Sequence, residues 1–95
     1  MDKMDIYLEK LEAQLKAWKA KIEMLEDEAA KATGETKIEL MRAIGDLRQK
    51  KEDLKERLKE LQKEGSAAWD IMKDGIEKAA SELKSALDKV ISRFK

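Results

Sequence analysis

The sequence predicts an all-α protein, an antiparallel coiled-coil three-helix bundle that is either closed in one chain or domain-swapped as a dimer of long helical hairpins. Ala, Glu, Lys, Leu and Arg supply more than half of the 95 residues, which is typical of coiled coils and long helices. There is no Pro, and the four Gly interrupt helices only weakly. Apolar residues recur at alternating spacings of three and four in three consecutive segments. We therefore interpret residues 1–95 as a single helical domain.

The first helical segment is predicted at about residues 2–33. Its apolar residues follow a strict a/d pattern, in which every second step is three residues and the others are four. The members of this seam are Leu8, Leu11, Leu15, Trp18, Ile22, Leu25 and Ala29.

The second segment, at about residues 36–64, repeats this pattern. Its seam consists of Leu40, Ile44, Leu47, Leu54, Leu58 and Leu61, with Lys51 at one a position. Lys51 has two interpretations that the sequence leaves open. It either fixes register and oligomeric state, as single polar a residues do, or lays its aliphatic stem against Trp18 with its ammonium in water.

Gly65 and Ser66 predict a helix end followed by a new N-cap, because Gly adopts left-handed conformations freely and a Ser hydroxyl accepts from free backbone amides. The third segment is predicted at residues 66–94. Its apolar face is wider than a two-residue seam and could contact two neighbours at once. This face consists of Trp69, Met72, Ile76, Ala79, Ala80, Leu83, Leu87, Val90, Ile91 and Phe94.

Residue numbers support an antiparallel register between the segments. Facing seam residues of the first two segments, such as Leu15 with Leu54, have numbers that add up to 69 throughout. The second and third segments keep a constant total of 130, as in Ile76 with Leu54. The layer that holds bulky Trp18 also holds Lys51 and small alanines, as close packing requires.

The link between the first two segments has two interpretations. Residues 33–36 form a reasonable turn, and Thr36 with Glu39 matches a capping box, which favours a closed monomer. Against this, the seam continues across the link in an eleven-residue step, and acidic residues 26–28 are unfavourable near a helix C-terminus. On balance we expect one straight helix of about 60 residues, roughly 90 Å long, and therefore a swapped homodimer.

Catalytic chemistry is not indicated. The chain has neither His nor Cys, and no base accompanies its serines, so we predict no catalytic, cofactor-binding or metal-binding residues. The acidic run at residues 23–28 is interpreted as a solvated helix face. The basic residues between 50 and 63 alternate with acidic ones, which argues against nucleic-acid binding. Pairs at i,i+4 such as Glu12/Lys16 and Asp53/Arg57 are expected to balance these charges.

The N-terminal residues lack the continuous apolar run of a signal peptide, and no segment approaches the length and apolarity of a membrane span. We therefore expect a cytoplasmic protein without integral membrane contact. The third segment could instead lie on a lipid surface through its apolar face, but its polar face mixes both charges.

Three stretches resemble a family of small bacterial coiled-coil proteins named for stress response. They are MDKMDIYLEKLEAQLKAWKAKIEML, AKATGETKIELMRAIGDLRQKKEDLKERLKEL and GSAAWDIMKDGIEKAASELKSALDKVISRFK. The resemblance implies a soluble, non-enzymatic cytoplasmic protein associated with stress, with no catalytic residues to transfer. The polar residues 33–36 depart from the Ala-rich middle of that family.

The sequence thus predicts a non-catalytic structural or interaction protein, for example a stress-response scaffold or adaptor with an unidentified protein partner. The alternative is a lipid-surface protein that uses the amphipathic third segment.

Overall fold

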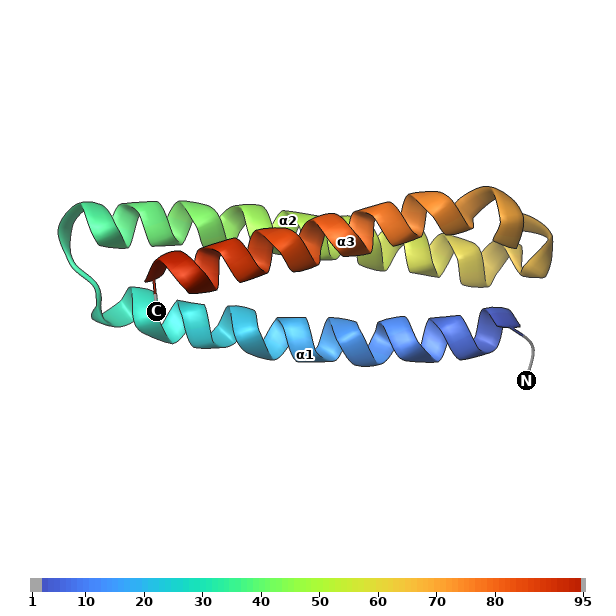
Figure 1. Ribbon diagram of the computed structural model, residues 1–95, viewed down its shortest axis with the longest axis horizontal. Coiled ribbons are helices and arrows are strands. Elements are labelled where there is room, and N and C mark those ends of the chain that lie inside the picture. Colours follow the sequence, from blue (N-terminus) through green and yellow to red (C-terminus); the bar gives the residue numbers. More distant parts are fainter. Residues whose placement is uncertain (1–2, 95) are drawn as a thin grey trace.

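The computed structural model describes residues 3–94 and confirms an all-α three-helix bundle. Helix α1 spans Lys3–Lys31, α2 spans Gly34–Glu64 and α3 spans Trp69–Phe94, with a short 3₁₀ turn, η1, at Ser66–Ala68. The helices run up, down and up, so that α1 and α3 point the same way and α2 opposes both (Figure 1). The predicted helix start at Asp2 lies outside the described residues.

One continuous cluster of apolar side chains from all three helices forms the core along the rod. Most of the predicted seam residues are buried in it. They are Leu8, Leu11, Trp18, Ile22, Leu25, Ala29, Leu40, Ile44, Leu47, Leu54, Leu58, Leu61, Ile76, Ala80, Leu83 and Leu87. Other predicted core residues pack against this cluster but remain partly exposed, namely Leu15, Trp69, Met72, Ala79, Val90, Ile91 and Phe94. Lys51 is also half-buried and does not belong to the buried core.

Polar contacts between the helices follow a regular antiparallel register. Glu12 pairs with Gln62 and Glu26 with Arg48, so a step of 14 residues along α1 (12 to 26) matches a step of 14 back along α2 (62 to 48). Arg93 Nη2 lies 2.7 Å from Glu39 Oε2, which fixes the far end of α3 against the beginning of α2. Helices α1 and α2 therefore keep a constant antiparallel register between these two contacts, as the constant total of the seam residue numbers predicts.

The expectation of one straight helix through residue 34 is wrong for this structure. Helix α1 ends at Lys31, and the chain reverses through Ala32 and Thr33 before α2 begins at Gly34. Gly34 has φ of +64°, a left-handed conformation that Gly adopts without a Cβ clash. The bundle is thus closed within one chain, and the seam residues meet across a short hairpin.

Both predicted N-caps differ from the observed ones. Helix α2 begins two residues before Thr36, and Thr33 is at its N-cap position without a side-chain capping bond, so Thr36 and Glu39 form no capping box. Ser66 begins the 3₁₀ turn instead of capping α3, which starts at Trp69. The reason is that Gly34 and Gly65, both with positive φ, complete the chain reversals by backbone conformation.

Candidate functional site: the open groove between α1 and α2

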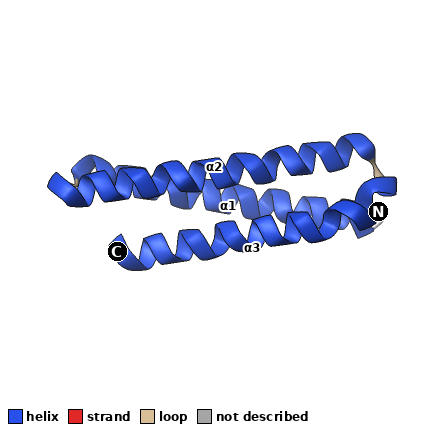
Figure 2. Ribbon diagram, turned by 90° about the horizontal axis from the view of Figure 1, so that it is seen from above, coloured by secondary structure: helices blue, strands red, loops and turns tan. Residues whose placement is uncertain are grey.

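The α1/α2 pair has two sides, and α3 covers one of them. The two orthogonal views show the three rods side by side, with α3 in front of the α1/α2 pair in Figure 1 (Figures 1 and 2). On the side away from α3, side chains of α1 and α2 surround two hollows of about 370 and 380 Å³. We call this side the open groove.

The first hollow of the open groove is rich in lysine. Lys51, Lys55 and Lys59 line it from α2, and Lys16 and Lys19 line it from α1. Leu15 and Leu58 form its apolar base. We call this part, defined by the five lysines and two leucines, the basic hollow.

The i,i+4 partners expected for the neighbouring charges do not form. Glu12 Oε1 instead accepts a hydrogen bond from Gln62 Nε2 at 3.0 Å, at the edge of the basic hollow. Asp53 likewise accepts one from Gln49 Nε2 at 3.1 Å. Among residues 3–94, ion pairs within 4 Å involve Arg48 with Glu26 and Arg93 with Glu39, and none involves the five lysines. The basic hollow therefore concentrates charge that its own neighbours leave unpaired.

Helix periodicity explains why the lysines gather there. Lys51, Lys55 and Lys59 are spaced at i, i+4 and i+8, which places them in one row beside the seam. A parallel row of Glu52, Glu56 and Glu60, each following one of these lysines in the sequence, is exposed. Lysines and glutamates that alternate in the sequence therefore lie on different faces of α2. The lysines line the groove, and the glutamates lie on the outer surface.

The second hollow is mainly apolar and lies nearer the α1/α2 turn. Ala29, Ala30, Met41, Ile44 and Gly45 line it together with Lys37, and Met41 is 57% exposed despite its apolar side chain. We call this set the apolar hollow.

An ion pair separates the two hollows. Arg48 of α2 reaches across to Glu26 of α1, and both residues also border the apolar hollow. The two hollows thus follow one another along a single groove.

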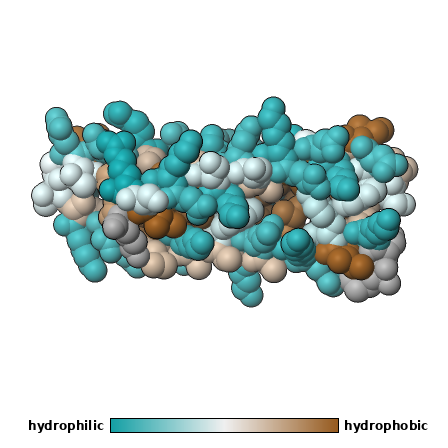
Figure 3. Space-filling model, in the orientation of Figure 1, coloured by the Kyte–Doolittle hydropathy of each residue, from teal (hydrophilic) through white to brown (hydrophobic). Residues whose placement is uncertain are grey.

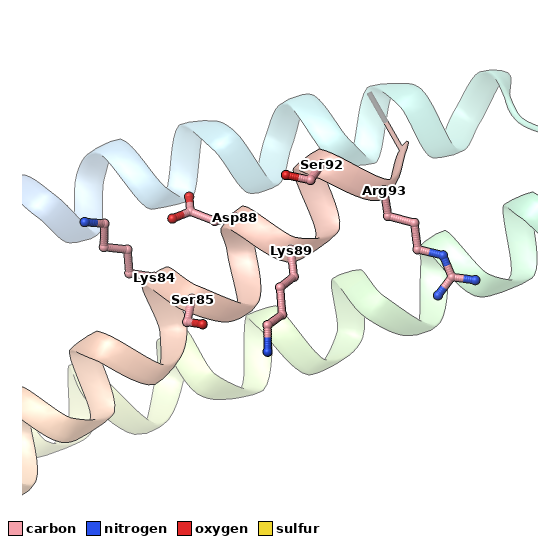
Figure 4. A pocket seen from close by; sticks show the side chains of 6 residues that line it. All are labelled: Lys84, Ser85, Asp88, Lys89, Ser92 and Arg93. Carbon is pink, nitrogen blue, oxygen red and sulfur yellow. The ribbon is translucent and has the colours of Figure 1, made fainter.

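A wider depression lies on the outer surface of α3, but it has no concave base. All six residues around it come from the last turns of α3, and their side chains splay outward towards α1 on one side and α2 on the other (Figure 4). One of them, Arg93, is already paired with Glu39. This surface offers no enclosed geometry for a ligand.

Aromatic contacts close the opposite end of the bundle. The Tyr7 and Trp69 rings meet edge to face with centroids 4.9 Å apart, and Lys73 Nζ lies 5.6 Å from the Trp69 ring centroid. Burial of the phenol, assisted by the negative charge of Glu77, raises the pKa of Tyr7 to about 12. These contacts tie the start of α1 to the start of α3 and have the character of packing.

Residues 3–94 contain no cluster of three or more acidic side chains placed to hold a metal ion. No helix among them is both long enough and apolar enough to cross a membrane.

The α3 face that a lipid-surface protein would use is turned inward. Ile76, Ala80, Leu83 and Leu87 are buried against the other two helices. The surface on the α3 side is mainly hydrophilic, with apolar side chains in separate small patches (Figure 3). Ile71, which is 83% exposed, is the most exposed of the large apolar residues described.

The open groove was not predicted from the sequence. The lysine row carried a signal, since residues 51, 55 and 59 share one helix face, but the adjacent acids suggested neutralisation. Lys51 itself belongs to this row and lines the basic hollow, so its ammonium is not enclosed in the seam.

Comparisons with protein-family models, with curated proteins and with solved structures find no match to this chain. The candidate site therefore rests on the geometry of the groove.

Proposed function

We propose that the protein is a non-catalytic, cytoplasmic interaction protein, a scaffold or adaptor that docks a helix of a partner protein in the open groove. The observation that carries this proposal is the contrast between the two sides of the α1/α2 pair. One side is filled by α3, whereas the other holds two hollows in line. An amphipathic helix laid into such a groove is a recurrent mode of recognition.

The shape and chemistry of the groove suit a helix better than a small molecule. Small-molecule sites typically enclose most of the ligand surface, whereas these hollows are open along one side of a rod. The distance along α2 from Met41 to Lys59 is about 27 Å at 1.5 Å per residue, or about five helical turns. Leu15, Leu58 and Ile44 provide apolar contacts at intervals along this length.

A role during stress is part of the proposal and is supported by the resemblance of the sequence to small bacterial stress-response coiled-coil proteins. A rod without catalytic groups and with one open helix-sized groove suits a scaffold that holds a partner. The chemistry of that partner is considered separately below.

Nuclear magnetic resonance titration with helical peptides tests groove docking. Three peptides of about 18 residues would share one leucine stripe and differ in their flanking residues, which are all Glu, all Gln or all Lys. We expect at least one to shift the backbone amides around Leu15, Met41 and Leu58 while leaving those around Lys84 and Ser92 unchanged. Absence of binding by all three, or shifts centred on α3, would contradict the proposed function.

A steric block in the apolar hollow provides a matched pair of variants. A Cβ added at Gly45 would meet no heavy atom of a neighbouring residue within 4 Å, so the helix can accept a side chain there. Gly45→Phe is expected to occupy the apolar hollow and abolish peptide binding. Gly45→Ala is the control, since it raises helix propensity at least as much but leaves the hollow open.

Lipid-surface binding is the alternative function, and it requires α3 to leave the bundle. That step would expose Ile76, Leu83 and Leu87, which are at most 1% exposed. Co-sedimentation with phosphatidylglycerol vesicles at physiological salt distinguishes the two functions. If the protein associates tightly with the vesicles and its tryptophan emission shifts to the blue, lipid-surface binding is the function and the docking proposal is wrong.

We also propose that the closed chain exchanges with a domain-swapped homodimer as protein concentration rises. Residues 33–39 are exposed, so opening the hairpin removes no buried side chain from the core. The same seam contacts can form between two chains once α1 and α2 become continuous. The open groove is lined by these two helices and is preserved in either form.

A further inference from the structure

We infer that the docked helix has two chemically different halves, a row of carboxylates over the basic hollow and an apolar stripe over the apolar hollow. This inference rests on the proposed docking function and identifies the class of partner, an acidic amphipathic helix. It follows from three features of the groove, which are its unpaired charge, its spacing and its two-part lining.

The first feature is charge. The basic hollow presents five lysines against the single carboxylate of Glu12, which is already bonded to Gln62. Like charges held together along one groove repel each other, and an anionic partner relieves that repulsion. Complementary charge also speeds association and rejects partners of the wrong sign.

The second feature is spacing. Lys51, Lys55 and Lys59 rise about 6 Å from one to the next along α2, at 1.5 Å per residue. Carboxylates at i, i+4 and i+8 of another helix have the same repeat, so the two rows can stay in step when the helices lie side by side. Lys16 and Lys19 of α1 line the opposite side of the basic hollow and can pair with carboxylates on the other flank of the docked helix.

The third feature is the change of lining along the groove. Beyond the Arg48–Glu26 pair, the groove is lined by Ala29, Ala30, Met41, Ile44 and Gly45, and Lys37 is the one further charged residue there. A helix that was acidic throughout would place a row of carboxylates over this mainly apolar surface, where Lys37 could pair with only one of them, and burying the others is costly. The half of the partner that covers this part must therefore be apolar.

The same geometry argues against nucleic acid as the occupant. Glu52, Glu56 and Glu60 form an exposed row beside the lysines, where a phosphate backbone would meet them. A helical partner avoids this clash because its carboxylates can be confined to the flanks that face the groove.

Peptide affinities measured by fluorescence anisotropy test the inference. Of four peptides with the same leucine stripe, we expect the one with Glu flanks on one half only to bind most tightly. The peptide with Gln flanks should bind about tenfold more weakly, and the peptide with Lys flanks at least a hundredfold more weakly. The peptide with Glu flanks on both halves should also bind more weakly than the half-acidic one. Affinity of the half-acidic peptide should fall as salt rises, because salt screens exposed charges.

Variants with equal changes in net charge locate the effect. The double variant Lys55→Gln/Lys59→Gln is expected to bind the half-acidic peptide about tenfold more weakly than the wild-type protein does. The double variant Lys78→Gln/Lys84→Gln on α3 should bind the same peptide with an affinity within twofold of the wild-type value. All four lysines are exposed, so both variants should keep the fold, which circular dichroism checks. Lys55→Glu/Lys59→Glu should reverse the preference and bind the Lys-flanked peptide more tightly.

The outcomes separate this inference from the docking proposal. If the Gln-flanked peptide binds the groove as tightly as the half-acidic one, docking stands and the inference about charge is wrong. If a DNA duplex binds the groove more tightly than the half-acidic peptide, the occupant is a nucleic acid and the inference is overturned. If no peptide binds at all, both proposals fail.

Discussion

Leu54 and Leu15 occupy paired positions in the predicted seam, yet their surroundings differ. Leu54 is completely buried, because α3 covers the side of α2 that carries it. Leu15 is half-buried, because it forms the base of the basic hollow on the side that α3 leaves open. At the scale of single residues, a position in the heptad sets the direction of a side chain but does not fix how deeply it is buried.

This difference predicts unequal effects of truncation. Leu54→Ala should lower the free energy of unfolding by about 2–5 kcal/mol, because it removes buried methyl groups and leaves a cavity. Leu15→Ala should cost about 1 kcal/mol, since less apolar area returns to water and the hollow can admit solvent. Urea unfolding followed by circular dichroism measures both values. Equal losses for the two variants would contradict the observed asymmetry of the core.

Tyr7 links protonation to the packing of the aromatic end. Its pKa is raised from 10.0 to about 12, first by burial and then by the negative charge of Glu77, so the folded protein favours the neutral phenol. The contribution of Tyr7 to stability is fully present below pH 10 and is lost as pH rises through about 12.

A spectroscopic titration checks this behaviour, because Tyr7 is the sole tyrosine of the chain. We expect phenolate absorbance to appear with a midpoint near pH 12 in the folded protein and near pH 10 in urea. Glu77→Gln should lower the folded midpoint, while leaving it above 10 because burial remains. A folded midpoint of 10 would show that the ring is solvated.

At the scale of elements, α2 has two different adjacent faces. Its seam residues pack against α1 and α3, and its lysine row lies immediately beside that seam. The wide apolar face of helix α3 covers one side of the hairpin, and the outer surface of α3 is mainly polar. Because α3 packs on one side of the α1/α2 pair, it completes the core and leaves the groove on the other side of that pair open.

Helix type and order followed from periodicity, because alternating spacings of three and four allow few other folds. The pairing of individual charges did not follow. Glu12 was expected to pair with Lys16 but bonds to Gln62 on another helix, because long side chains choose among several neighbours at similar free energy. The lysine-lined hollow was missed for this reason, although every residue in it was visible in the sequence.

The choice between a turn and a continuous helix at residues 33–36 also lay beyond sequence reasoning. A Gly within a helix costs only about 1 kcal/mol, so the straight and closed chains are nearly equal on local grounds. The conformation of Gly34 decides between them in the structure, and the nearby capping signal at Thr36 plays no part.

At the scale of the whole molecule, the protein is a thin rod with extents of 50 × 19 × 19 Å. Its core is one continuous cluster, and the hairpin at one end contributes little to it, since residues 33–39 are exposed. The closed chain and a swapped dimer therefore bury nearly the same side chains. Their relative populations depend on the turn and on protein concentration.

Gly34→Ala should shift this equilibrium towards the swapped dimer. In the closed chain, Ala at φ +64° costs about 1–2 kcal/mol, whereas in a continuous helix Ala is favoured over Gly by about 1 kcal/mol. Light scattering should give the wild-type protein a mass near 10.9 kDa when dilute, and the variant about twice that mass at the same concentration. Gly45→Ala, within α2 and away from the turn, is the control and should leave the mass unchanged. If Gly34→Ala remains monomeric and loses no stability, the left-handed turn does not hold the hairpin closed, and the proposed exchange is wrong.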